Sequence, residues 1–138
     1  MKPFDKHWNY TNPVQTRTFF EQQLSEYPYQ TDADGHLQLL TQIARTYSLQ
    51  GNVLQAHTIL DNVQKLLTVK TELAAVRYHL ERGRTYNFEK NIEQATIHFK
   101  QAEEKAIAGK YDTYAVDALH MQAIVAPPEK AIDINRKA

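Results

Sequence analysis

The six histidines are the side chains of this sequence best suited to binding a metal ion. No two of them stand four residues apart, the spacing that places two ligands on one face of a helix, and there is no H-E-x-x-H motif. The sequence also has no cysteine, which removes thiolate metal sites and thiol chemistry. We therefore expect no metal site among these histidines, which are His7, His36, His57, His79, His98 and His120.

Nucleophilic catalysis also lacks a candidate residue. Ser25 and Ser48 are the only serines, and neither lies in a G-x-S-x-G motif. Glycine-rich phosphate-binding motifs are absent, so no segment is typical of a nucleotide site. The neighbouring carboxylates Glu103 and Glu104 fit a solvated helix face. We predict that the protein is not an enzyme and uses no cofactor.

The charge balance argues against partners that need a strongly charged surface. The 16 lysines and arginines match 16 aspartates and glutamates, so the net charge is zero, whereas proteins that bind nucleic acid are usually basic. No apolar run approaches the length of a membrane helix, and the N-terminus lacks the apolar stretch of a signal peptide. We expect no nucleic acid and no membrane as partners, and a cytoplasmic location.

Helical periodicity dominates the rest of the chain. Only 4 glycines and 5 prolines occur in 138 residues, which favours long helices joined by short turns. Apolar spacing predicts helices over about 14–26, 37–50, 53–67, 73–86, 92–108 and 112–125, and a further helix from Pro128. Because the chain stops soon after this last helix begins, we expect it to be a fragment of a longer protein.

Helix ends are marked by polar and glycine residues. Asn52 with Gln55, and Asn91 with Gln94, are typical of helix N-caps, and Gly51 suits the left-handed residue that ends a helix. Before the first helix, residues 1–12 have no clear period and form an irregular N-terminal leader. In it, Trp8 and Tyr10 either cover a hydrophobic helix end or belong to a mobile segment.

The sequence repeats itself with an offset of 39 residues. A third copy follows at an offset of 40, where Ala75 and Val76 match Ala115 and Val116. Such a period indicates stacked structural units, each of which buries its apolar faces against its neighbours. The pairs at the offset of 39 are Ala44 and Gly83, Tyr47 and Tyr86, Asn52 and Asn91, Ala56 and Ala95, Leu60 and Phe99, and Val63 and Ala102.

This pattern of small, tyrosine, turn and alanine positions resembles the tetratricopeptide repeat (TPR) family, over roughly residues 34–138. The resemblance implies an all-α fold, a right-handed α-α superhelix of antiparallel helix hairpins. It would hold about two and a half repeats plus the helix at 14–26, which covers the first hairpin. The domain would span 13–138, with repeats at about 34–70, 71–109 and 110–138, the last incomplete. The period exceeds the family's usual value of about 34 residues, so helices or turns are longer here.

The TPR resemblance further implies a protein-protein interaction module that binds a partner peptide in its concave groove. The side chains of Arg45, Arg77 and Arg84 would converge there, and guanidinium groups suit an acidic or carboxylate-bearing segment. Where the family's chaperone-binding proteins use lysine and asparagine, Thr41 and Arg45 stand, so that specialised role is not expected. The implied groove residues are Gln38, Thr41, Arg45, Ser48, Arg77, Leu80, Arg84, Asn87, Asp117 and His120.

Two alternatives remain open from the sequence. In the first alternative, the arginines bind no ligand and form structural ion pairs within or between repeats, because Arg82 and Arg84 lie close to Glu81 and Glu89. In the second alternative, the chain is a structural or regulatory segment of a larger protein and has no peptide ligand of its own. It would then form homo-oligomers through the exposed end of the solenoid.

Overall fold

The computed structural model describes residues 2–127, 130 and 134, and in these residues the chain is helical with no strand. The expected all-α class is confirmed. The helix expected from Pro128 lies outside the described residues. The elements are η1 (Pro3–His7), α1 (Pro13–Gln23), η2 (Leu24–Glu26), α2 (Ala33–Leu49), α3 (Val53–Leu66), α4 (Glu72–Phe88), α5 (Ile92–Ala108) and α6 (Asp112–Val125), where η is a 3-10 helix.

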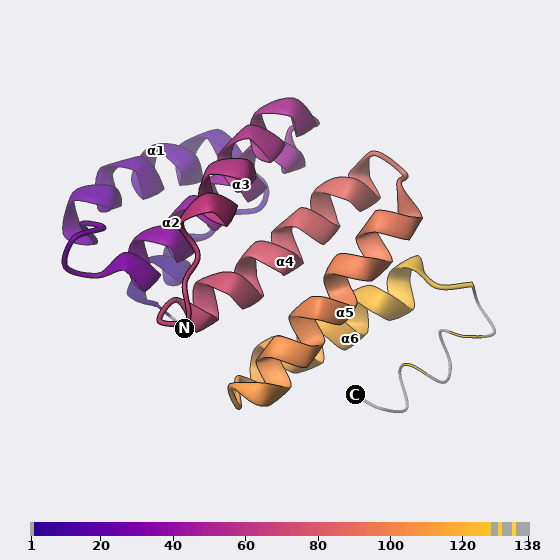
Figure 1. Cartoon of the computed structure of the whole chain (residues 1–138). Coiled ribbons are helices and arrows are strands. Elements are labelled where there is room, and N and C mark those ends of the chain that lie inside the picture. Colours follow the sequence, from indigo (N-terminus) through magenta and orange to yellow (C-terminus); the bar gives the residue numbers. More distant parts are fainter. Residues whose placement is uncertain (1, 128–129, 131–133, 135–138) are drawn as a thin grey trace.

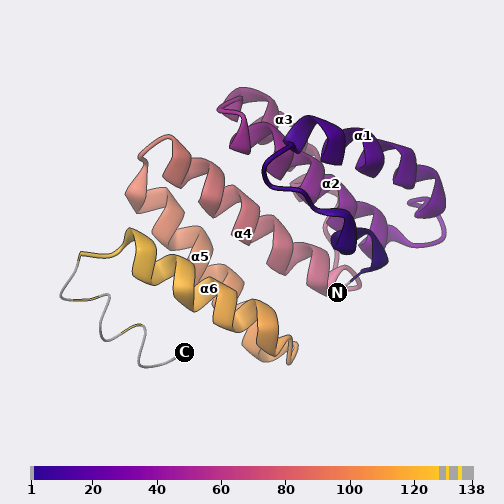
Figure 2. The ribbon, with the colours of Figure 1, turned by 180° about the vertical axis from the view of Figure 1, so that it is seen from behind.

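The helices follow one another across the molecule, with α1 to α3 on one side, α4 in the middle, and α5 and α6 on the other side (Figures 1 and 2). Consecutive helices from α1 to α6 pack against each other. Helix α2 also packs directly against α4, and α4 contacts α6. The odd-numbered helices therefore alternate with α2, α4 and α6, and α4 contacts both α2 and α6.

The offset of 39 residues is visible in the helices themselves. Helices α2 and α4 both have 17 residues, and both end one residue before an equivalent C-cap. Between them, Gln42 Nε2 donates to Glu81 Oε2 over 3.3 Å, a pair 39 residues apart. The pair Gln38 and Arg77 has the same separation, and Arg77 Nη1 donates to Gln38 Oε1 over 3.2 Å. Equivalent positions of the two copies thus lie side by side.

The N-caps expected at Asn52 and Asn91 are confirmed, since their side chains accept from the backbone N–H of the residue three positions later, over 3.2 and 3.3 Å. The structure adds a third cap of this kind, because Asn12 accepts from the N–H of Gln15 over 3.2 Å. Helix α1 therefore begins as α3 and α5 do, and it packs on α2. Each cap stabilises its helix by about 1 kcal/mol.

Large buried side chains occupy equivalent positions in α1, α3 and α5. Phe20 of α1, Leu60 of α3 and Phe99 of α5 are all fully buried. The close contact between α4 and Phe99 of α5 depends on a glycine, Gly83. A Cβ atom at Gly83 would lie only 2.5 Å from Cε1 of Phe99, so α4 and α5 approach each other where no side chain intervenes.

The N-terminal leader, expected to be irregular, contains the 3-10 helix η1 and is packed on the helices. Phe4 is 1% exposed and meets the rings of Phe20 and Tyr27 edge-on, with centroids 5.8 and 5.3 Å apart. Trp8 Nε1 donates to Gln42 Oε1 on α2 over 2.9 Å. The aromatic residues of the leader thus extend the core over one side of α2.

In the described residues, left-handed backbone occurs at three turns, and at two of them the left-handed residue is a lysine. Gly51 has φ of 80° as expected, but Lys90 has 64°. After α5 the left-handed residue is Lys110, with φ of 61°, rather than Gly109. A residue with a Cβ atom is strained in this region by about 1 kcal/mol.

We predict that Lys90→Gly raises the free energy of unfolding by about 1 kcal/mol, because it relieves this strain. Lys100 is the matched control, since it is an exposed lysine inside α5. There, glycine should instead lower the free energy of unfolding by about 1 kcal/mol. Urea denaturation followed by circular dichroism measures both. A loss of stability in Lys90→Gly would contradict the assigned strain.

Candidate functional site

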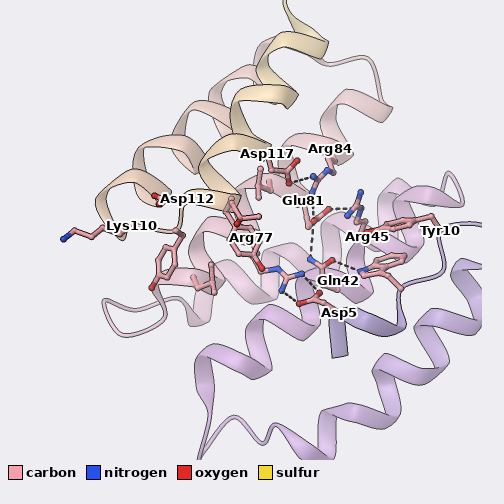
Figure 3. A pocket seen from close by; sticks show the side chains of 16 residues that line it. Asp5, Tyr10, Gln42, Arg45, Arg77, Glu81, Arg84, Lys110, Asp112 and Asp117 are labelled. Carbon is pink, nitrogen blue, oxygen red and sulfur yellow. Dashed lines mark hydrogen bonds and ion pairs between the residues drawn. The ribbon is translucent and has the colours of Figure 1, made fainter. Parts of the chain in front are cut away.

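A pocket of about 580 Å³ lies where the leader meets α2, α4 and the start of α6 (Figure 3). Its volume falls within the usual range of ligand pockets in proteins, about 300–1,000 Å³. The leader contributes Asp5, Trp8 and Tyr10, and α2 contributes Gln42 and Arg45. The remaining lining residues are Leu73, Arg77, Leu80, Glu81, Arg84, Lys110, Tyr111, Asp112, Thr113, Tyr114 and Asp117.

Arg77 is already bound by a carboxylate of the same chain. Its Nη1 and Nη2 donate to the two oxygens of Asp5 over 2.8 and 2.7 Å, and both side chains are only 6% exposed. Burial opposes the charged guanidinium and lowers its pKa. The hydrogen bond and charge of Asp5, together with the charges of Tyr114 and Glu81, outweigh burial, so the pKa of Arg77 lies above its ordinary value. Arg77 is therefore a charged group neutralised inside the fold.

Glu81 lies at the centre of a second charged group. Its Oε2 accepts from Arg84 Nη1 over 2.7 Å, and Arg84 Nη2 donates to Asp117 over 2.7 Å (Figure 3). Arg45 Nε is 3.7 Å from Glu81 Oε1, too far for a hydrogen bond. Within the described part of the chain, both of these buried atoms have no hydrogen-bond partner.

Arg45 is held mainly by aromatic rings. Its guanidinium lies 5.4 Å from the ring centre of Trp8 and 4.9 Å from that of Tyr10. These two rings stack on each other, with centroids 4.6 Å apart and planes 5° from parallel. The Arg45 side chain is 22% exposed. Its guanidinium is thus positioned at the pocket by these rings and by the ion pair with Glu81, and within the described residues its Nε makes no hydrogen bond.

The structure brings some of the expected groove residues together and separates others. Arg45, Arg77, Leu80, Arg84 and Asp117 all line the pocket, so the three arginines do converge. The other expected groove residues lie outside this lining: Gln38, Thr41 and Ser48 are buried, Asn87 is half-buried and His120 is exposed.

Gln38 and Thr41 are fully buried because their polar atoms are used within the fold. Gln38 Nε2 donates to Asp34 over 2.7 Å while its oxygen accepts from Arg77. Thr41 Oγ1 donates to the carbonyl of Gln38 over 2.6 Å. In this structure neither side chain is available to a ligand.

Sequence reasoning missed part of the acidic side of the pocket. It gave no role to Asp5, which neutralises Arg77, and it named Glu81 only as an ion-pair partner of nearby arginines and not as a groove residue. It also missed the turn before α6, where Lys110 and Tyr111 line the pocket. A signal for Glu81 was present, because it follows Gln42 by the repeat offset of 39 residues. No local signal connects Asp5 to Arg77, which lies 72 residues later.

Three comparisons of this chain, with protein-family models, with curated proteins and with solved structures, found no match. The residues of the pocket offer two unused chemical groups, an arginine beside stacked aromatic rings and a buried carboxylate oxygen. The guanidinium of Arg45 can donate to a carboxylate or another acceptor, whereas the Glu81 oxygen can accept only from a donor. Among the residues that the structure describes, no helix is both long and apolar enough to cross a membrane.

A second polar cluster lies between α3, α4 and α5. His79 Nδ1 and His98 Nδ1 are 3.0 Å apart, a distance that lets one neutral imidazole donate to the other. Arg82 bonds the ring of His57 over 2.8 Å and Asp61 over 2.7 Å. No set of three or more potential metal ligands occurs in the described ranges.

Stability is expected to fall on acidification because of these two histidines. Burial, together with the charges of His98, Lys105 and Arg82, lowers the pKa of His79 from 6.5 to about 3. Burial and the charges of Arg82 and His57 lower that of His98 from 6.5 to about 4. The unfolded chain therefore binds protons that the folded chain does not, and the free energy of unfolding drops as pH falls from about 6.5 towards 4.

Replacing both histidines by glutamine should flatten this pH dependence, as measured by urea denaturation at a series of pH values. His120→Gln is the control, because His120 is exposed on α6 and lies outside the cluster. An equal loss of stability on acidification in the double variant and the wild type would contradict the assignment.

Proposed function

We propose that the chain is a TPR-like right-handed helical repeat domain that binds a segment of a partner protein in the pocket beside α2, α4 and α6. The repeat architecture is supported by the equal lengths of α2 and α4 and by the hydrogen bonds between residues 39 apart. The common N-cap of α1, α3 and α5 supports it further. In the proposed solenoid, α2, α4 and α6 are the first helices of the three repeats and form its concave inner face.

The observation that carries the binding function is the state of Arg45. Its guanidinium is stacked near two aromatic rings at a pocket, and its Nε is buried without a hydrogen bond. Fixed side chains lose little conformational freedom on binding, so a stacked arginine is a favourable anchor for a partner. We infer that a carboxylate of the partner bonds Arg45, while an apolar partner side chain contacts the half-buried Leu73.

The pocket selects for one carboxylate rather than for a highly acidic segment. Arg77 and Arg84 are each paired with acids of the chain, so they contribute little net positive charge. Asp112 and Asp117 add negative charge at the far end of the pocket, beside Lys110. A segment with a single acid among aromatic and polar residues fits this distribution better than an acidic run does.

Selection from a random-peptide display library tests this proposal. We expect the full chain to enrich peptides with a shared acidic position, and Arg45→Ala to weaken their binding by about tenfold or more in fluorescence anisotropy. Arg17→Ala is the matched control, because Arg17 lies over the ring of Tyr47, outside the pocket lining. Enriched peptides that bind Arg45→Ala as tightly as the wild type would contradict the site.

Self-association is a second candidate function, favoured by exposed apolar side chains on α6. Val116 is 39% exposed and Ile124 is 65% exposed. Burying these two side chains against a second copy would remove their apolar surface from water, which favours association. Light scattering over a range of protein concentrations tests this, since a constant monomer mass would contradict it.

A further inference from the structure

The leader makes with Arg77 the contact that a ligand carboxylate would make with a binding-site arginine. Asp5 meets the guanidinium with both oxygens over 2.7 and 2.8 Å, the bidentate geometry of specific carboxylate recognition. The two residues are 72 positions apart in the chain. Arg77 thus binds a carboxylate of a segment that lies outside the helical repeats.

The residues on either side of Asp5 also behave as ligand groups seated on the helices. Phe4 inserts among buried residues that include Leu39 and Ile43 of α2. Trp8 donates to Gln42 and stacks with Tyr10 beside Arg45. The leader thus uses an aromatic residue followed directly by an acid, and then a second aromatic anchor.

The leader and the pocket share one surface. Asp5, Trp8 and Tyr10 form one wall of the pocket, and Arg77 both holds Asp5 and lines the pocket (Figure 3). Release of the leader would expose the bonding groups of Arg77 and Gln42 and enlarge the surface open to a partner. The position of the leader therefore sets how much of the inner face is accessible.

We propose that residues 2–10 are a resident ligand of the face formed by α2 and α4. An external segment in which an aromatic residue directly precedes a carboxylate competes with them for this face. The proposal deepens the proposed function, on which it rests for the idea that this face binds peptides. It adds a second mode of binding, in which the partner takes the place of Phe4 and Asp5 with its carboxylate on Arg77, and a means of regulation, the exchange of the leader for the partner.

The docking of the leader can be followed in the intact chain, because Trp8 is its only tryptophan. We expect Asp5→Asn to increase acrylamide quenching of Trp8 emission about twofold or more, since it removes the charge that holds the leader on Arg77. Lys6→Gln is the matched control, because Lys6 is exposed in the same segment. Equal quenching in wild type and Asp5→Asn would overturn the proposal.

Gln42→Ala provides a second variant, should circular dichroism show that Asp5→Asn has lost its helices. It removes the hydrogen bond to Trp8 but keeps Asp5, Arg77 and Phe4 in place. It must also increase quenching of Trp8, and unchanged quenching would overturn the proposal.

The second measurement adds the leader as a separate molecule. A labelled peptide with the sequence of residues 1–10 is titrated into the full-length chain and followed by fluorescence anisotropy. The released-leader variant is Asp5→Asn, or Gln42→Ala where Asp5→Asn has lost its helices. We expect saturable binding to this variant, and binding about tenfold weaker to the wild type, whose own leader competes. The same peptide with asparagine at the position of Asp5 should bind neither protein. Absence of binding to the released-leader variant overturns the proposal.

The outcomes separate this inference from the proposed function. If display peptides bind through Arg45 but the leader peptide does not bind, the inference fails and the proposed function stands. If the leader peptide binds the released-leader variant while no display peptide is enriched, the face accepts its own leader alone, and the proposed binding of a partner fails.

Discussion

Arg77→Ala is expected to lower the free energy of unfolding by about 3–5 kcal/mol. The substitution leaves the carboxylate of Asp5 almost buried, at 6% exposure, and without its bidentate partner. It also removes the donor to Gln38 and thereby one of the bonds between α2 and α4. Urea denaturation followed by circular dichroism measures the change.

Removing both charges distinguishes the ion pair from simple loss of packing. Arg77→Met combined with Asp5→Leu leaves no unpaired charge, so it should recover at least about 2 kcal/mol of the loss seen with Arg77→Ala. A loss of less than about 1 kcal/mol in Arg77→Ala itself would indicate a pair as weak as those on protein surfaces. In that case, the leader would not be held by Arg77.

Gly83→Ala is expected to lower the free energy of unfolding by about 1–3 kcal/mol, although alanine normally favours a helix. The added Cβ would lie 2.5 Å from Cε1 of Phe99, a fully buried ring that cannot move into solvent. The equivalent residues of the preceding repeat are Ala44 and Leu60, both fully buried. In the first repeat Leu60, which is smaller than Phe99, is paired with Ala44, which is larger than Gly83.

The double variant Gly83→Ala with Phe99→Leu reproduces in the second repeat the pair found in the first. Phe99→Leu alone should cost about 1–2 kcal/mol through loss of packing. Because the alanine fills the space that the ring vacates, the double variant should be more stable than the sum of the single effects by about 1 kcal/mol or more. Strict additivity in chemical denaturation would contradict the equivalence of the two repeats.

Much of the helical framework was predictable because its signals are local. Asn52 and Asn91 mark the starts of α3 and α5, and Gly51 takes the left-handed backbone expected of it. The expected range 112–125 coincides with α6. The Asn12 cap has the same signal, with glutamine three residues later, and could have been recognised as a further copy at an offset of 40.

The interior of the pocket was less predictable, because it depends on contacts between distant segments. The repeat offset placed Arg45, Arg77 and Arg84 on corresponding helices, and they do line one pocket. Whether each arginine is free depends on acids elsewhere. The pairs Arg84–Glu81 and Arg84–Asp117 are of the kind that the ion-pair interpretation expected. The partner of Arg77 comes from the leader, whose sequence has no helical period to fix its position.

The central claim is that a partner segment lies on the inner face, along α2, α4 and α6. Nitrogen-edited NMR spectra of the intact chain, recorded with a peptide enriched from the display library, test it most directly. We predict that the largest shift changes occur at Arg45, Arg84, Asp117 and the residues from Lys110 to Tyr114, all of which line the pocket. Changes concentrated instead on the exposed residues of α3 and α5 would contradict the claim.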